Sequence, residues 1–236
     1  MELSDLFDKY GIQARLRPAG FAALPALALT WPVGLTNLAS LVVPICGAAG
    51  VLLFVVNVVR SRGLRVQERL IRQWDGLPTT HQLRYRDTES RELLARRRKK
   101  VEQVYGEPLP DEQAELTDPA AADKVYAAAI RSLIGKMNKH REDYPLIHAE
   151  NITYGYRRNL LGLKRIAVPL AALCLCGDVL LGVFGTLSIG HWVAGGVQLF
   201  VLAAWLFIVN DAWVRQAADT YTLRLFEALD DLIKLE

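Results

Sequence analysis

The sequence predicts an all-α integral membrane protein with four transmembrane helices, paired as two hairpins around an inserted helical cytoplasmic domain. No Asp, Glu, Lys or Arg occurs from Pro18 to Val59, and only Asp178 interrupts the uncharged run from Ile166 to Asn210. About 20 apolar residues cross a bilayer as an α-helix, so each run is long enough for two crossings. The densely charged residues 60–165 between the two runs are not apolar enough to enter the membrane.

The distribution of positive charge predicts the topology. Of the 28 Lys and Arg residues, 22 lie in residues 60–165, 3 in residues 1–20 and 3 in residues 210–236. The expected outer turns, near 30–40 and 186–191, contain neither residue type. Cytoplasmic loops carry the excess of Lys and Arg, so both termini and the middle segment are expected in the cytoplasm.

We therefore expect five segments along the chain. They are a cytoplasmic N-terminal segment (1–18), hairpin 1 (19–60), a basic cytoplasmic helical domain (61–165), hairpin 2 (166–210) and a cytoplasmic amphipathic C-terminal helix (211–236). The individual crossings are expected at 19–36, 40–60, 166–186 and 190–210. The first crossing is short and contains Pro25 and Pro32, so kinked helices or a re-entrant hairpin are alternatives to a full span.

The middle segment has the pattern of three helical stretches. The second membrane helix is expected to continue two or three turns past residue 60, up to a turn at Trp74–His81 in which Thr79 or Thr80 is the N-cap. Further helices are expected over 88–105 and 120–142, joined by an exposed linker at 106–119 that contains three prolines.

The C-terminal segment shows helical periodicity. Leu225, Leu229 and Leu232 recur at i, i+4 and i+7, which is typical of an amphipathic helix and is compatible with an oligomerisation seam. The segment is acidic, whereas residues 60–165 are basic. We expect the two to attract each other.

Asp178 is the clearest candidate for a pore or gate residue. A carboxylate within a crossing is costly and usually faces protein or a water-filled cavity. The alternative is an Asp near the membrane edge that is neutralised or bonded to a neighbouring helix. Gln198 and Asn57 are further pore or gate candidates, although such polar side chains more often bond across helices.

The densest basic run is a candidate phosphate site, because Arg and Lys next to aromatic side chains suit a phosphate-bearing ligand. The alternative is a juxtamembrane surface attracted to anionic lipid headgroups. The candidate ligand- or phosphate-binding residues are Arg84, Arg86, Arg91, Arg96, Arg97, Arg98, Lys99, Lys100, Arg157 and Arg158.

Motifs of enzymes and metal sites are missing from the sequence. The middle segment has no Walker loop, GxSxG, HExxH or GxGxxG motif, and the four histidines have no metal-binding spacing. Cys174 and Cys176 point to different sides of a helix, so they can neither pair nor share a metal. We expect no enzyme activity, no cofactor and no metal; an intramembrane enzyme is a weaker alternative.

Three blocks, at 10–18 (YGIQARLRP), 74–80 (WDGLPTT) and 150–164 (ENITYGYRRNLLGLK), together resemble a bacterial family of uncharacterised four-helix membrane proteins. By architecture the chain also resembles membrane effectors of anti-phage defence systems, including the Hailong type, whose effector is encoded beside a nucleotidyltransferase. The resemblance implies a multi-pass inner-membrane homo-oligomer that collapses the membrane potential. It also implies control by a nucleotide or oligonucleotide ligand.

Two functional hypotheses follow from the sequence. The first is an oligomeric inner-membrane effector, an ion channel or membrane-disrupting assembly in antiviral defence, gated by a nucleotide-type ligand on its basic domain. The second is a non-catalytic membrane scaffold that anchors a soluble partner protein through the same domain. Ion flux in reconstituted vesicles separates the two.

Overall fold

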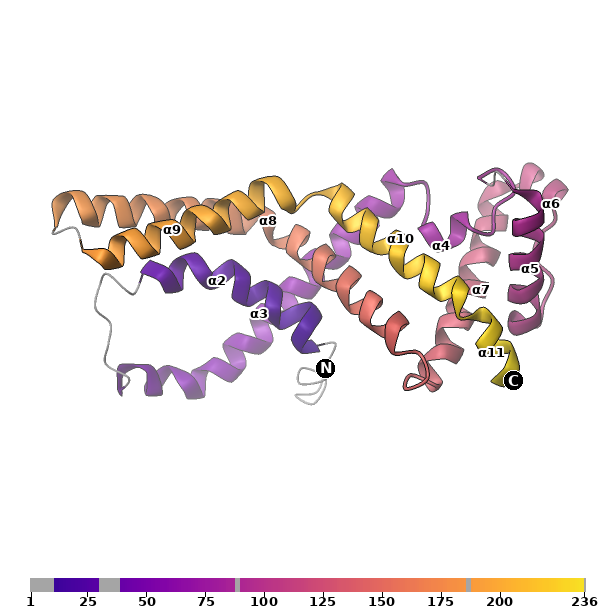
Figure 1. Cartoon of the computed structure of the whole chain (residues 1–236), viewed down its shortest axis with the longest axis horizontal. Coiled ribbons are helices and arrows are strands. Elements are labelled where there is room, and N and C mark those ends of the chain that lie inside the picture. Colours follow the sequence, from indigo (N-terminus) through magenta and orange to yellow (C-terminus); the bar gives the residue numbers. More distant parts are fainter. Residues whose placement is uncertain (1–10, 30–38, 88–89, 186–187, 236) are drawn as a thin grey trace. The chain divides into compact units, whose positions relative to one another are not determined.

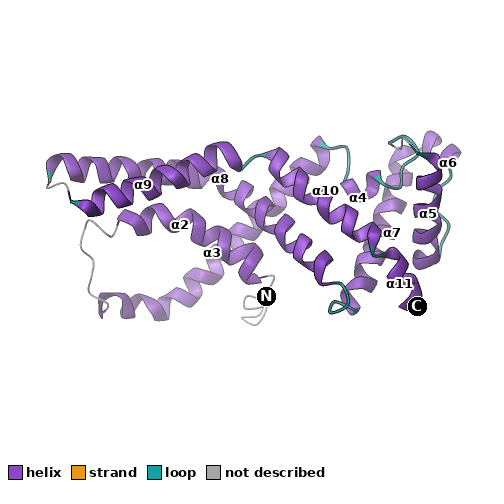
Figure 2. Cartoon of the chain, in the orientation of Figure 1, coloured by secondary structure: helices purple, strands orange, loops and turns teal. Residues whose placement is uncertain are grey.

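The structure is a computed structural model that describes residues 11–29, 39–87, 90–185 and 188–235, and all regular secondary structure in these ranges is helical. The side chains of residues 39–54 and 234–235 are not described. Figure 2 shows helices joined by short loops and turns. The predicted all-α class is therefore confirmed.

The chain separates into two compact units. The apolar unit comprises Met1–Glu68 and Gly155–Val214, and the polar unit comprises Arg69–Tyr154 and Arg215–Glu236. The C-terminal tail thus folds with the middle segment in one unit, although the sequence suggested two separate segments. Residues 155–165, expected in the cytoplasmic domain, belong to the apolar unit.

The apolar unit is helical (Figure 1). Its two longest helices are the first part of α3 (Ala39–Gln73) and the second part of α8 (Pro145–Phe184). The shorter ones are the π-helical η1 (Gly11–Leu16), α2 (Arg17–Leu29), α9 (Ile189–Ala203), the π-helical η2 (Ala204–Ile208) and the first residues of α10 (Asp211–Glu227). Helix α2 packs against α9. As expected, α3 continues without interruption beyond residue 60.

Two helices of the described residues are long and apolar enough to cross a membrane, α8 and the continuous α9–η2. Only 28% and 22% of their apolar windows are buried, so most of each window is not covered by other helices of the chain. Phe184, Ile189 and Phe207 are 86%, 81% and 78% exposed. The predicted hairpin 2 thus has an apolar outer surface that suits lipid.

The first predicted hairpin is described only in part. Helix α2 ends at Leu29, with Pro25 inside it, and residues 30–36 of the crossing expected at 19–36 lie outside the described residues. Helix α3 begins at Ala39, which agrees with the crossing expected at 40–60. Neither helix is among those that pass the length and hydropathy test in the described residues, so the four-helix count remains a prediction.

Helices α3 and α8 cross in close contact within the apolar unit. A methyl group added at Gly162 would lie 2.8 Å from the backbone carbon of Arg62 and 2.8 Å from the backbone nitrogen of Gly63. Beside this crossing, the Asn159 amide donates to the carbonyl oxygen of Ala14 at 2.6 Å. Only glycine at 162 permits the two helix backbones to approach this closely.

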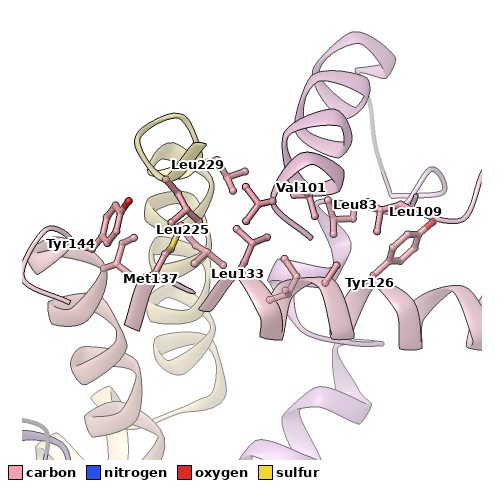
Figure 3. Close-up of a cluster of buried hydrophobic side chains, with 14 of the residues drawn as sticks. Leu83, Val101, Leu109, Tyr126, Leu133, Met137, Tyr144, Leu225 and Leu229 are labelled. Carbon is pink, nitrogen blue, oxygen red and sulfur yellow. The ribbon is translucent and has the colours of Figure 1, made fainter. Parts of the chain in front are cut away.

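The polar unit has its own hydrophobic core (Figure 3). It lies among α5 (Arg91–Tyr105), α7 (Pro119–Lys139), α10 (Asp211–Glu227) and α11 (Leu229–Leu235). Leu225, Leu229 and Leu232 are each 1% exposed and belong to this core. These three leucines therefore stabilise the monomer, and the hypothesis that they form an oligomerisation seam is wrong.

The segment expected as an exposed linker is instead fixed to the fold. It contains α6 (Glu112–Thr117), whose Glu115 is 3% exposed. The Glu115 carboxylate accepts hydrogen bonds from the backbone N–H groups of Tyr85 and Arg86 and from the Tyr126 hydroxyl. Burial opposes ionisation of Glu115, but these donors outweigh it and lower the pKa of Glu115.

Local helix signals were predicted with mixed success. Helix α5 begins at Arg91 and α7 ends at Lys139, within a few residues of the expected bounds, with Ser90 and Asp118 as N-caps. The turn helix α4 (Pro78–His81) has Leu77 as its N-cap and Pro78 in its first turn. The expectation of an N-cap at Thr79 or Thr80 is therefore wrong, because proline begins this helix.

Candidate functional site

A pocket in the polar unit gathers part of the predicted basic run. One side of α5 faces α10 and α11 across a cavity of about 350 Å³, within the size of roughly 300–1,000 Å³ common for small-molecule sites. A second cavity of about 390 Å³ shares Gln82, Leu93 and Arg97 with the first. The polar and aromatic residues that line the first cavity include Gln82, Arg96, Arg97, Lys100, Phe226 and Asp230.

Arg97 lies where the two cavities meet. Its guanidinium donates a hydrogen bond to Gln82 Oε1 and is 5.8 Å from the centroid of the Phe226 ring. No carboxylate of the described residues forms an ion pair with Arg97. Partial burial lowers its pKa, but a guanidinium stays charged at neutral pH. Arg97 therefore offers a positive charge without a direct carboxylate partner in the described residues, beside an aromatic face, in a pocket whose lining also includes Glu227 and Asp230.

Lys100 is on the rim of the same pocket. Its ammonium Nζ is 2.6 Å from Asp230 Oδ1 on α11, so the expected attraction between the basic run and the acidic tail is confirmed at this pair. The two side chains are 37% and 59% exposed. Such exposed pairs contribute about 0–1 kcal/mol, so an incoming anion can replace Asp230 at low cost.

Two predicted phosphate-binding residues lie inside the fold. Arg84 is 1% exposed and donates to the carboxylates of Asp123, Asp75 and Asp87. Burial favours the neutral form, but the hydrogen bonds and charges of Asp123 and Asp87 outweigh it and raise the pKa of Arg84. Arg98 is 5% exposed and donates to the backbone carbonyls of Leu83 and Pro110.

Three other residues of the predicted set lie outside the first pocket. Arg86 bonds to Glu115 and Asp123, and Arg91 makes two hydrogen bonds to Glu112, of 2.6 and 2.7 Å. Lys99 is exposed and lines neither cavity. The pocket thus retains Arg96, Arg97 and Lys100 from the predicted run on α5.

Arg157 and Arg158 belong to the apolar unit, where both hold helices together. Arg157 donates to the carbonyl oxygen of Trp213 at 2.9 Å, and its guanidinium carbon is 4.7 Å from the ring centroid. Arg158 is 9% exposed and donates to the side-chain oxygens of Gln67 and Asn159. The pocket residues, by contrast, all belong to the polar unit.

Asp178 has a partner in the apolar unit. It is 4% exposed, and its Oδ1 is 2.9 Å from His191 Nδ1 on α9. The bond joins α8 to α9, which matches the alternative of an Asp bonded to a neighbouring helix. A buried Asp–His pair is also able to exchange a proton.

The two other pore candidates differ in burial. Gln198 on α9 is completely buried, and its amide Nε2 donates to the carbonyl oxygen of Pro25 on α2 at 3.3 Å. It therefore bonds across helices, as such residues often do. Asn57 on α3 is exposed. The three predicted pore or gate residues do not form one cluster of mutual hydrogen bonds.

Sequence reasoning missed four residues of these sites. Phe226 and Asp230 were visible only as part of an amphipathic, acidic tail, and Gln82 gave no signal. His191 has no residues at metal-binding spacing around it, so its sequence context indicates no metal site. The signal for His191 was its position near the expected turn of hairpin 2. From there it is able to reach a carboxylate on the preceding helix of the same hairpin.

Comparisons with protein-family models, with curated proteins and with solved structures gave no match.

Proposed function

We propose that the chain is a non-catalytic effector of the bacterial inner membrane, a homo-oligomer that conducts ions under the control of a nucleotide-type ligand. In this proposal four helices cross the bilayer with both termini in the cytoplasm. The family resemblance would imply a nucleotidyltransferase encoded nearby and a role in anti-phage defence. The main observation in support of the proposal is the pocket around Arg97. It places positive charge beside an aromatic ring in the polar unit, which is covalently continuous with the apolar helices.

The pocket chemistry suits a nucleotide. The guanidinium groups of Arg96 and Arg97 are able to bind a phosphate through charge-assisted hydrogen bonds. The Phe226 ring offers a face for a base, and stacking of this kind contributes about 1–3 kcal/mol per base. The Gln82 amide is able to bond a base edge or a phosphate oxygen.

The Lys100–Asp230 pair gives the ligand a way to act on the protein. A phosphate near Lys100 would compete with Asp230 and so weaken the attachment of α11 to α5. The two states in this proposal differ in whether Asp230 is bound to Lys100 or released from it. A ligand shifts the equilibrium between them only if it binds one state more tightly than the other. Helix α10, which precedes α11, contains residues of both units, as do α3 and α8.

The binding test compares Arg97→Gln with a matched control on the same helix. Lys99→Gln removes one positive charge as well, but Lys99 lines neither cavity. Binding of radiolabelled ATP and of a labelled mixed-sequence tetranucleotide to the purified full chain is measured. Loss of a charge-assisted hydrogen bond of about 1.5–3 kcal/mol weakens binding on the order of tenfold or more. Equal affinities of the two variants contradict the ligand site.

The conduction test uses vesicles loaded with K⁺ that contain the full chain, with and without added tetranucleotide. A ligand-dependent change in K⁺ or H⁺ efflux, lost in Arg97→Gln and kept in Lys99→Gln, supports the effector. Ligand binding with no flux of either ion supports the membrane scaffold instead. Binding that requires anionic lipid vesicles and not a nucleotide identifies the pocket as a headgroup site and overturns the nucleotide proposal.

A further inference from the structure

We propose that the seam where α2, α8 and α9 meet is a proton path through the apolar unit, with Asp178 and His191 as its protonatable pair. This inference rests on the proposed function, because it names the ion that the apolar unit conducts. It also places the path inside one subunit. The evidence lies in a row of buried polar atoms on one side of α9 and η2.

Three polar side chains follow one another on this side at intervals of seven residues. His191, Gln198 and Trp205 lie two helical turns apart, about 10 Å per step. Gln198 and Trp205 are completely buried. Both face α2: Gln198 donates to the Pro25 carbonyl oxygen, and the Trp205 ring lies 5.6 Å from the ring of Phe21. Figure 1 shows α9 running beside α2.

Two atoms in this row have no hydrogen-bond partner among the described residues. They are Gln198 Oε1, an acceptor, and Trp205 Nε1, a donor. A polar group buried without a partner costs several kcal/mol in an apolar medium. Separate water molecules in the seam would satisfy both atoms, because one would accept from Trp205 Nε1 and another would donate to Gln198 Oε1. The seam thus combines two properties that a chain of proton-carrying waters needs, a buried donor and a buried acceptor.

Each end of the row carries a titratable group. At one end is the Asp178–His191 pair, with Asp178 Oδ2 3.4 Å from the place where a Gly195 Cβ would lie. At the other, Lys164 on α8 donates to the carbonyl oxygen of Val209 at 2.6 Å. Val209 follows the π-helical η2, and π-helical turns inside α-helices are frequent at functional sites.

Few other titratable groups are near the pair. On the buried side of α8, the Cys174 thiol lies one turn before Asp178, and Gly182 one turn after it. The described part of α2 from Pro18 to Leu29 contains no titratable side chain, and neither does α9–η2 apart from His191. Asp178, His191 and the Cys174 thiol are therefore the titratable side chains on the buried sides of these described helices at this end of the seam.

The chemistry favours a proton over a metal cation. Ion-selective paths replace the hydration shell with rings of several oxygens, whereas Asp178 already uses Oδ1 on His191. A proton needs only one acceptor at a time. The step starts from an imidazole protonated at Nδ1 and a carboxylate. His191 gains a proton at Nε2 and releases its Nδ1 proton to Asp178 Oδ1, so one N–H bond forms and one breaks. The imidazole ends neutral with its proton at Nε2, the carboxyl group ends neutral, and one proton is passed on in total. Asp178 then passes this proton to water in the seam.

The experiment uses the full chain in vesicles that enclose a pH-sensitive dye, with K⁺ efflux measured in parallel and with the tetranucleotide both present and absent. Asp178→Asn and His191→Gln keep the shape of the pair, and each is expected to lower proton flux on the order of tenfold or more, because a protonatable group is lost. The remaining flux in Asp178→Asn is expected to lose the pH dependence of the unmodified chain.

Trp205→Phe tests the seam apart from the pair, since it removes the Nε1 donor and keeps an aromatic ring. Its matched control is Trp192→Phe on α9, because Trp192 is 74% exposed. Proton flux is expected to fall in Trp205→Phe and to stay unchanged in Trp192→Phe, with thermal stability recorded for both. A loss of stability without a loss of flux in Trp205→Phe assigns Trp205 to packing alone and overturns the path.

The outcomes separate this inference from the proposed function. Proton flux that falls in Asp178→Asn and Trp205→Phe supports the path. K⁺ flux without proton flux, or proton flux equal in all variants, overturns the path and leaves the effector proposal intact. Absence of both fluxes under every condition overturns both.

Discussion

The crossing of α3 and α8 gives the sharpest prediction about the fold. In Gly162→Ala the new methyl carbon would meet backbone atoms of Arg62 and Gly63 at 2.8–3.0 Å, where ordinary contact begins at 3.4 Å. Backbone atoms of a helix cannot rotate away as a side chain can. The two helices must therefore separate by about 0.6 Å at this point.

The cost follows from two contributions. Overpacking of this kind costs about 1–3 kcal/mol, and weakening of the Asn159 hydrogen bond to Ala14 adds about 1 kcal/mol. A total of about 2–4 kcal/mol corresponds to a fall in Tm of roughly 4–16 °C for a chain of this size.

The assay is thermal unfolding of the detergent-solubilised chain, followed by circular dichroism. Gly196→Ala on α9 is the matched control, because it is also a helical glycine of the apolar unit but has nothing within 4 Å of its added methyl group. It is expected to keep or raise Tm, since alanine has the higher helix propensity. Equal Tm values for Gly162→Ala and Gly196→Ala would refute the close crossing.

Three further predictions concern the polar unit. Leu229→Ala is expected to lower the free energy of unfolding of this unit by about 2–5 kcal/mol, because it leaves a cavity. Leu223 is 54% exposed, so Leu223→Ala should change the free energy of unfolding, measured by chemical denaturation, by less than about 0.5 kcal/mol. The pKa of Glu115 is lowered in the folded chain, so its stabilisation is complete above the ordinary pKa of 4.5 and is lost as pH falls through the folded pKa. Glu115→Gln should lower the free energy of unfolding by about 1–2 kcal/mol at neutral pH. Between pH 7 and pH 3, the Tm of this variant should fall less than the Tm of the unmodified chain. An equal fall of Tm in both proteins would contradict the role of Glu115. A double-mutant cycle of Lys100→Ala and Asp230→Ala should give a coupling of about 1 kcal/mol or less, and a larger value would mean that an anion cannot easily displace Asp230.

The sequence correctly predicted local features that depend on a single helix. The long uncharged run around Asp178 indicated the apolar pair α8 and α9–η2, and the continuation of α3 past residue 60 followed from its composition. Ser90 and Asp118 cap helices because each side chain accepts a backbone N–H three residues ahead. Such signals depend on neighbours in the chain and need no tertiary contact.

The same sequence contained no information on which basic residues face outward. Arg97 and Arg98 are consecutive, so their side chains leave α5 about 100° apart. Arg98 points into the core beside Tyr126, and Arg97 points into the pocket. The difference is set by the positions of α7 and the C-terminal helices, which are distant in the sequence.

The acidic tail also shows that the sequence does not determine which surface a side chain contacts. Its leucine periodicity predicted one helix with one apolar side over 211–236, and the structure instead has two consecutive helices, α10 and α11, that share the apolar side. The periodicity also could not tell whether this side packs on another chain or on the same chain. The structure places Leu225, Leu229 and Leu232 in the core of the polar unit, and this brings Phe226 and Asp230 to Arg97 and Lys100. The candidate pocket exists only because of that packing.

The sequence by itself determined the helical class, the apolar runs and the cost of a carboxylate at Asp178, because hydropathy and charge depend on composition along the chain. Tertiary structure alone decided the partner of that carboxylate. His191 is thirteen residues away and reaches Asp178 because α8 and α9 form a hairpin. It likewise decided that Gln198 and Trp205 share a buried seam with α2, since burial depends on which helix covers which side.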